Sequence, residues 1–247
     1  MTENLKDALV YAVGLSKNEK VIYEQNGKTY YDTNRSSLLE LEPIKRAETL
    51  TVSTLSSLVS FLIDHFAYNP DNPKLMIHVE SPTSVKVLSE LDADRKRESL
   101  IQAKTTTDSF PYRRFLDSEQ FIINMQSLIQ REDDAEAILK CASSLRIEGG
   151  ADLTDNGVSQ VASVKVGAAT VEKGKVPSPA GLRPYRTFLD IEQPKSPFIF
   201  RVNKDGDCAL FEADGGIWKN IATGDIKEYL DAALADLIEA KKITVIA

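Results

Sequence analysis

Two short segments of the chain repeat a set of side chains that could bind an anion or stack on a ring. Residues 111–117 read Pro-Tyr-Arg-Arg-Phe-Leu-Asp, and residues 184–190 repeat them at six of seven positions. An arginine beside a tyrosine could stack on a nucleobase or hold a phosphate. Alternatively, the aromatic rings anchor the chain to the core while the arginine pairs with a local carboxylate. The candidate interaction residues in these segments are Tyr112, Arg113, Phe115, Tyr185, Arg186 and Phe188.

Trp218 is a further candidate interaction residue. It is the single tryptophan of the chain and follows Gly215 and Gly216 closely. Adjacent glycines let a backbone turn tightly or approach a ligand closely. The pattern fits either the lip of a ligand site or a tight turn with Trp218 packed on the core or in a subunit interface. Residues 203–207 are rich in oxygen ligands but lack the later ligands of a calcium loop, so we interpret them as a hairpin turn.

No motif in the sequence points to a reaction. The phosphate-binding loop, the dinucleotide fingerprint, the nucleophile elbow and the zinc-protease motif do not occur. His65 and His78 have no His or Cys at ligand spacing, and Cys141 and Cys208 stand far apart, which favours structural roles for all four. We therefore expect no catalytic residue, no cofactor and no metal ligand. A hydrolase that uses carboxylates alone is a weaker interpretation than a protein that is not an enzyme.

The charge balance argues against a surface built for polyanions. The chain has 37 acidic and 30 basic side chains, a net charge of −7, which mildly repels nucleic acid and anionic membranes. The densest basic cluster, at 95–97, is surrounded by Asp92, Asp94 and Glu98, as is typical of a solvated loop. No stretch approaches the length of an apolar membrane span, and the first residues do not read as a secretion signal. We expect a cytoplasmic protein without membrane contact.

These candidates must be positioned by a mixture of helices and strands. In the first half, apolar periodicity predicts helices over 3–13 and 54–67, a hairpin around Asn26-Gly27, and an antiparallel meander over 75–103. The elements predicted downstream are helices near 118–129, 133–146 and 225–240 and strands within 158–171, at 197–202, at 209–211 and at 243–246. The sequence therefore predicts an α+β fold with mostly antiparallel strands, about five helices and a β-rich second half. Residues 1–147 and 148–247 are expected to form two regions packed as one unit.

The two repeated segments lead into different elements. Asp117 can cap the helix that follows it, with Gln120 three residues later as in a capping box. After the second copy, Pro194 works against a helix. We therefore interpret the repeat as one anchoring device used twice, and we do not expect two superposable halves.

Three diffuse patterns along the chain carry a family resemblance. Residues 54–62 read Thr-Leu-Ser-Ser-Leu-Val-Ser-Phe-Leu, residues 110–117 add a Phe before the first repeat, and residues 196–201 read Ser-Pro-Phe-Ile-Phe-Arg. With these patterns the chain resembles the uncharacterised bacteriophage and prophage proteins of the YfdQ-like group. The resemblance implies a phage or prophage gene product of unassigned role inside a bacterial host cell. It implies no catalytic residues.

Together these observations favour a non-enzymatic, self-assembling protein that forms a homo-oligomer. Its subunits would meet through exposed aromatic and strand surfaces. The alternative is an accessory factor of phage DNA replication or recombination that binds single-stranded nucleic acid through the arginine–aromatic segments. The acidic charge balance weighs against this alternative.

Overall fold

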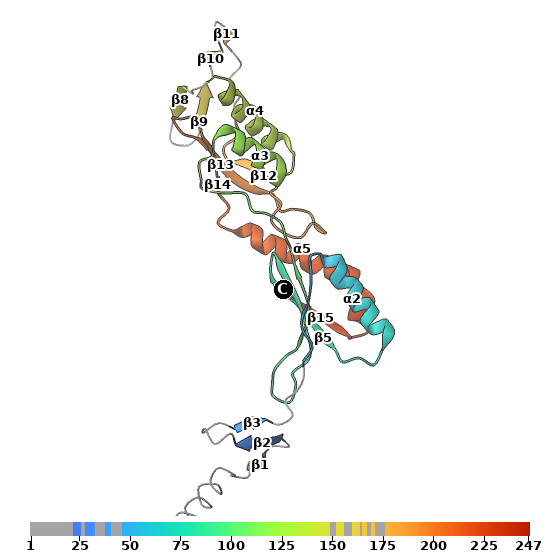
Figure 1. Ribbon diagram of the computed structural model, residues 1–247. Coiled ribbons are helices and arrows are strands. Elements are labelled where there is room, and N and C mark those ends of the chain that lie inside the picture. The colour runs from blue at the N-terminus through green and yellow to red at the C-terminus, as the bar shows by residue number, and fades with distance from the viewer. Residues whose placement is uncertain are drawn as a thin grey trace, which may run out of the picture. The chain divides into compact units, whose positions relative to one another are not determined.

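The computed structural model describes residues 46–148 and 176–247, together with strand segments inside 22–40 and 152–170. Its contacts divide the chain into two compact units, Met1–Arg46 and Ala47–Ala247. In the first unit, an antiparallel sheet (Figure 1) consists of β1 (Ile22–Gln25), β2 (Lys28–Asp32) and β3 (Leu38–Glu40). Gln25 pairs with Lys28, which confirms the predicted hairpin. Its two turn residues and the helix predicted over 3–13 lie outside the described residues.

A five-stranded mixed sheet belongs to the second unit, in the order β15–β5–β6–β7–β4. Its strands are β4 (Leu50–Val52), β5 (Leu75–Ser81), β6 (Ser84–Leu88), β7 (Ser99–Lys104) and β15 (Ile243–Ile246). The middle three strands form the predicted antiparallel meander, whereas β15 pairs with β5, and β4 with β7, in parallel. The sequence did not predict β4, because three residues are too few for an alternating pattern to show.

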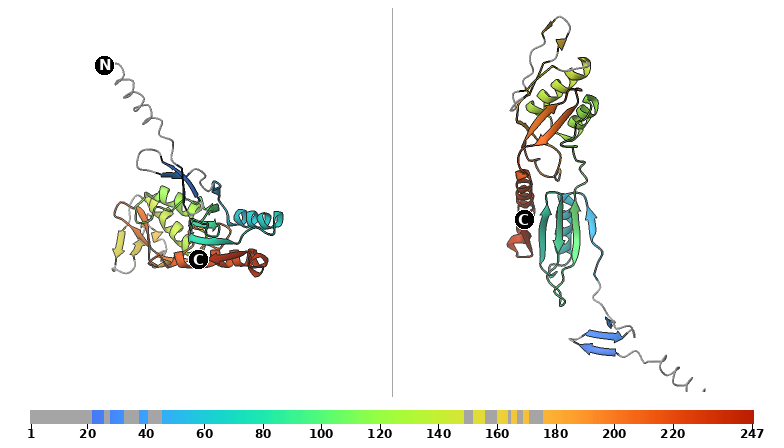
Figure 2. Two further views of the ribbon diagram at one scale, coloured as in Figure 1. Left: turned by 90° about the horizontal axis from the view of Figure 1, so that it is seen from below. Right: turned by 90° about the vertical axis from the view of Figure 1, so that its left-hand side faces the viewer.

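Helices α2 and α5 cover one face of this sheet. α2 (Leu55–Tyr68) begins after the N-cap Thr54, whose hydroxyl accepts a hydrogen bond from the Ser57 N–H at 3.2 Å. Figure 1 shows α2 and α5 (Ile217–Ala233) on the same side of the strands, and the right-hand view of Figure 2 faces the strands with α2 behind them. We call their shared interior the five-stranded core. It consists of Leu55, Leu58, Leu62, Phe66, Leu75, Ile77, Val79, Val85, Val87, Ile101, Ala103, Phe188, Ile226, Leu230, Leu234 and Ile243.

A second interior, the three-stranded core, lies between an antiparallel sheet and two helices. The sheet consists of β12 (Ala180–Leu182), β13 (Ser196–Val202) and β14 (Cys208–Glu212), and the helices are α3 (Ser118–Leu128) and α4 (Asp133–Glu148). As predicted, the Asp117 carboxylate caps α3, accepting a hydrogen bond from Gln120 N at 2.9 Å. Cys141 and Cys208 are buried in this core, and burial raises the pKa of the Cys208 thiol to about 12. The cysteines thus pack as apolar side chains.

The fold class is α+β, as the sequence predicts. The described residues contain five helices, α2 to α6, and mostly antiparallel strands. Two further antiparallel pairs are formed by β8 (Asp152–Asp155) with β9 (Gln160–Ser163) and by β10 (Lys165–Val166) with β11 (Ala169–Thr170). Each core takes residues from both sides of position 147, so the cores do not divide there. The reason is that Phe188 and α5 return to the five-stranded core late in the chain.

The C-terminal helical region differs from its prediction. Periodicity predicts one helix over 225–240, but α5 begins at Ile217, and a separate α6 (Ala235–Glu239) follows it. The first turns of α5 escape the pattern because Ile217 and Ile221 are exposed, so no buried apolar stripe marks them. Gly216 precedes α5 with a φ of 88°, a conformation that favours glycine. Trp218 thus lies in the first turn of α5, directly after the turn at Gly215 and Gly216.

Candidate functional site

The first repeated segment adds to the edge of β14. Leu116 exchanges two backbone hydrogen bonds with Cys208, at 2.9 and 2.8 Å, and Arg113 N also donates to β14, at 2.8 Å. Arg113 has a φ of 62° and an exposed side chain. The ring of Phe115 lies 6.2 Å from that of Phe211 and is 41% exposed. Two of the predicted interaction residues, Arg113 and Phe115, thus lie at the surface beside β14.

The second repeated segment buries its arginine. Arg186 is 8% exposed, and its guanidinium lies 3.2 Å from Glu212 Oε1 and donates to the Ser196 hydroxyl. Its Cζ lies 4.1 Å from the ring centroid of Trp218, which is a cation–π distance. Burial lowers the pKa of Arg186 from its ordinary value, an effect that neighbouring groups partly oppose. The guanidinium therefore already has charged, polar and aromatic partners within the protein.

Tyr112 of the first segment packs on the same Phe198 ring as Arg186. The Tyr112 ring stacks on Phe198 with centroids 5.5 Å apart, and Arg186 Cζ lies 5.6 Å from the same Phe198 ring. The Tyr112 hydroxyl is buried and has no hydrogen-bond partner among the described residues. Burial raises the pKa of Tyr112 far above its ordinary value, against a lowering influence of Arg186. We call the resulting group the Arg186 cluster; it consists of Tyr112, Arg186, Ser196, Phe198, Glu212 and Trp218.

Asp214 holds the start of α5 against this cluster. Its carboxylate accepts hydrogen bonds from Gly216 N at 2.9 Å, from Trp218 N at 3.2 Å and from the Ser196 hydroxyl at 2.9 Å. Burial would raise the pKa of Asp214, but these hydrogen bonds and the nearby guanidinium hold it below its ordinary value. The turn at Gly215 and Gly216, which could have formed a ligand lip, leads directly into α5. Asp214 caps the start of that helix.

The remaining predicted residues serve other parts of the fold. Phe188 is 1% exposed and belongs to the five-stranded core. Tyr185 is half-buried, and its N–H donates to the Leu128 carbonyl at the end of α3, at 2.9 Å. The structure thus brings together Tyr112, Arg186 and Trp218 but not all seven candidates. Arg113 and Arg186 do not form a shared clamp, because one is exposed and the other is buried and ion-paired.

Both repeated segments end in a helix cap. Asp117 caps α3, the helix directly after it, whereas Asp190 caps α2, which lies much earlier in the sequence. The Asp190 carboxylate accepts hydrogen bonds from Leu55 N at 3.1 Å and from Ser56 N at 3.0 Å. This contact supports the interpretation of the repeat as an anchoring device used twice.

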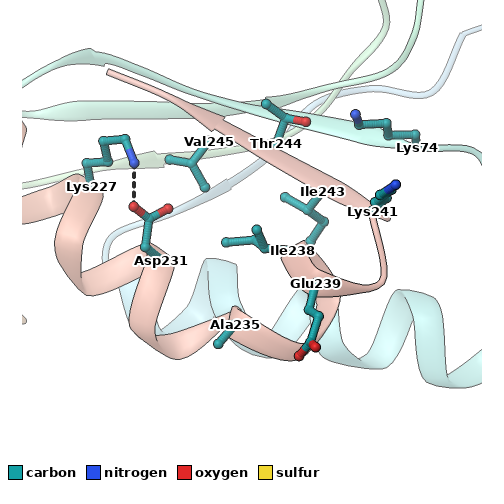
Figure 3. A pocket seen from close by; sticks show the side chains of 10 residues that line it. All are labelled: Lys74, Lys227, Asp231, Ala235, Ile238, Glu239, Lys241, Ile243, Thr244 and Val245. Atoms are coloured by element: carbon teal, nitrogen blue, oxygen red, sulfur yellow. Dashed lines mark hydrogen bonds and ion pairs between the residues drawn. The ribbon is translucent and has the colours of Figure 1, made fainter.

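A groove beside β15 is a site that the sequence did not indicate. It has a volume of about 560 Å³ and lies between β15 and the helices α5 and α6 (Figure 3). Its apolar lining comes from Ala235, Ile238, Ile243 and Val245. Its charged lining comes from Lys74, Lys227, Asp231, Glu239 and Lys241. Figure 3 shows the Lys227–Asp231 ion pair close to Val245 at one end of the groove.

The outer edge of β15 belongs to this groove. The carbonyl of Lys242 accepts a hydrogen bond from Leu75 N at 3.0 Å, so Lys242 faces β5. Because backbone groups alternate in direction along a strand, Ile243 and Val245 turn their N–H and C=O groups to the outer edge. In the described part of the chain, no strand pairs with that edge. The groove therefore combines backbone donors and acceptors with an apolar lining, which suits an added strand.

Part of the signal for this site is present in the sequence. The Ile-Thr-Val-Ile strand at 243–246 is predicted correctly, and it carries none of the charges, prolines or bulges that usually protect an edge. Its position at the edge of the sheet depends on pairing with β5, far away in the sequence. Local periodicity cannot indicate such a pairing.

The described residues show neither a metal-binding cluster nor a membrane-spanning helix. They contain no cluster of three or more His, Cys, Asp or Glu side chains that could hold a metal ion. No helix described is long and apolar enough to cross a bilayer. His65 stacks on Phe61 within α2, with centroids 5.8 Å apart, and His78 lies in β5. Both histidines thus occupy the elements predicted for them.

In comparisons with known proteins, the chain matches no protein-family model, no curated protein and no solved structure. Its membership of the YfdQ-like group accordingly stays a prediction. Support for a function therefore comes from the geometry of the described residues.

Proposed function

We propose that the protein is a non-enzymatic subunit that self-associates into a homo-oligomer through the outer edge of β15. The observation that carries the proposal is the groove of about 560 Å³, partly apolar and partly charged, beside a strand edge that pairs with no described strand. The phage or prophage origin and the cytoplasm of a bacterial host belong to the same proposal. They are supported by the sequence resemblance.

The outward backbone groups of β15 favour pairing with a strand of another copy. An added strand forms backbone hydrogen bonds with an edge, and pockets beside the edge receive its alternate side chains. Ile246, at the end of β15, is 46% exposed, so the edge also displays apolar surface. A partner strand would satisfy the outward backbone groups of Ile243 and Val245 and cover that surface.

Binding of single-stranded nucleic acid has less support. That function needs arginine and aromatic side chains displayed along one groove. Arg186 is 8% exposed and ion-paired with Glu212, and Phe188 is 1% exposed. A gel-shift assay at low salt tests this alternative directly, and a shift that depends on Arg113 would favour it.

The proposal is tested by sedimentation velocity of the full chain over a concentration series. The unaltered protein should sediment as a multiple of 27.3 kDa. Val245→Pro removes an outward-facing N–H without removing a hydrogen bond to β5, so it should remain folded and sediment as one chain. Val245→Ala is the matched control, because it also trims the side chain but keeps the N–H, and it should retain most of the association.

Two results would contradict the proposal. A mass of one chain for the unaltered protein at every concentration would exclude self-association. Association of Val245→Pro at the same concentrations as the unaltered protein would exclude the β15 edge. Far-ultraviolet circular dichroism of each variant confirms that the fold is retained.

A further inference from the structure

The opposite edge of the five-stranded sheet has a complementary surface. β4 pairs with β7 on one side, and no strand within the described ranges pairs with its other side. Leu50 of β4 stands opposite Ile101 of β7, so both side chains point to the same face of the sheet. Ile101 is fully buried under the helices, whereas Leu50 is 51% exposed. An exposed leucine therefore projects on the helix-covered side of this edge.

The two edges run in the same direction. β15 is parallel to β5, β5 and β7 are both antiparallel to β6, and β4 is parallel to β7. β4 and β15 are therefore parallel to each other. A second copy placed beside β15, with its helices on the same face of a continuous sheet, brings its β4 alongside β15 in parallel.

Leu50 complements the groove in this arrangement. The groove lies on the helix side of β15, between Val245 and Ile238 (Figure 3). Leu50 of the second copy projects on that same side and meets the apolar lining. Burial of the exposed part of Leu50 should stabilise the contact between the two copies by about 1 kcal/mol, in addition to the backbone hydrogen bonds. This corresponds to roughly a fivefold gain in affinity.

Charges around the two edges also complement each other. Lys74 and Lys241 line the groove just before the strands β5 and β15 begin. Glu48 is exposed and lies two residues before Leu50, just before β4 begins. Parallel pairing brings the starts of the two strands together, so Glu48 of the second copy meets the lysines. A two-fold β15–β15 contact would run antiparallel and would leave both Leu50 and Glu48 outside the interface.

We infer that the groove beside β15 receives the β4 edge of a second copy, in parallel, with Leu50 in the groove and Glu48 near Lys241. The inference rests on the proposed self-association and names the surface that makes the contact. Such a contact joins two different surfaces, so it is heterologous and can repeat from copy to copy. The product is a ring if the rotation between copies closes, and a filament if it does not.

Two variants with opposite defects test the pairing by sedimentation velocity. Val245→Pro blocks the β15 edge and leaves β4 intact. Leu50→Lys leaves the groove intact and places a charged side chain where the apolar lining of the groove would have to bury it. Each variant alone should sediment as one chain. An equimolar mixture should form a species of two chains and nothing larger, because each pair joins one intact β4 edge to one intact groove.

The control is Ile123→Lys on α3, which alters an isoleucine of similar exposure, 57%, beside the three-stranded core. It should assemble like the unaltered protein. Two-chain particles of Leu50→Lys alone would overturn the inference in favour of two-fold β15 pairing, while leaving self-association in place. A mixture that stays at one chain would also overturn it. If the unaltered protein is itself a single chain, both the inference and the proposed function are wrong.

Charge reversal tests the parallel orientation separately. Glu48→Lys and Lys241→Glu should each weaken association by about fivefold, the upper range for an exposed ion pair. The double variant should recover the affinity, because it restores opposite charges in reversed positions. Losses that add in the double variant would overturn the parallel orientation.

Discussion

The two repeated segments have nearly the same sequence but different structural roles. In the first, Arg113 is exposed and Leu116 pairs with β14; in the second, Arg186 is buried and ion-paired. Yet both segments end in a helix cap, since Asp117 caps α3 and Asp190 caps α2. The carboxylate therefore keeps its role while the arginine changes its own.

Some properties of a short segment depend on its own residues, and others depend on its surroundings. Capping needs only a carboxylate near unpaired N–H groups, so it recurs with the sequence. Burial depends on what lies opposite the segment, and it changes between the copies. Leu116 is buried and Phe115 is 41% exposed in the first copy, whereas Phe188 is buried and Leu189 is 68% exposed in the second.

The largest expected difference concerns the two phenylalanines. Phe188→Ala should lower the free energy of unfolding by about 4 kcal/mol, because it leaves a cavity in the five-stranded core. Phe115→Ala should lower it by about 1 kcal/mol or less, because much of the ring is already in water. Urea unfolding of both variants measures the difference. Equal losses of unfolding free energy would mean that Phe115 and Phe188 are equally buried, which would contradict the structure.

The arginines should differ somewhat less. Arg186→Ala should lower the free energy of unfolding by about 3 kcal/mol, because it leaves the Glu212 carboxylate without its partner and uncovers the Trp218 ring. Arg113→Ala should change it by about 0.5 kcal/mol or less, as for an exposed side chain.

Tryptophan fluorescence distinguishes the role of Arg186 from general destabilisation. Trp218 is the single tryptophan, so a red shift of the native emission in Arg186→Ala would report its exposure to water. Arg186→Lys keeps the charge but loses the planar stacking surface, and it should show an intermediate shift. An unchanged native emission in both variants would contradict the stacking contact.

Elements set by local chemistry were predicted well from the sequence. The cap at Asp117, the meander of β5 to β7 and the last strand at 243–246 each follow from a few neighbouring residues. The helix predicted over 225–240 was placed incorrectly at its start, because Ile217 and Ile221 do not continue the stripe formed by the buried residues Ala222, Ile226 and Leu230.

The sites depend on contacts between distant residues, which no local pattern encodes. The Arg186 cluster joins Tyr112 and Trp218 to Arg186 from three separate segments. The groove beside β15 exists because β15 pairs with β5 at one edge of the sheet. The sequence indicated three members of the cluster as candidates, namely Tyr112, Arg186 and Trp218. It could not show that Arg186 contacts partners within the protein.

The smallest expected effect tests the property that the two segments share. Asp117→Ala and Asp190→Ala should each lower the free energy of unfolding by about 1 kcal/mol, because each removes a helix cap. Their local effects should differ, and hydrogen exchange can resolve them. In Asp117→Ala the Gln120 amide should exchange faster, whereas in Asp190→Ala the amides of Leu55 and Ser56 should do so.

The position of the faster exchange decides the interpretation. Asp190 lies far from α2 in sequence, so faster exchange at Leu55 and Ser56 can arise only if the second segment reaches that helix end. Thr54 still caps Ser57 in this variant, so the Ser57 amide serves as an internal reference. If Asp190→Ala speeds exchange only around its own position, the second copy does not cap α2. The common role of the two segments would then be wrong, and only their difference would remain.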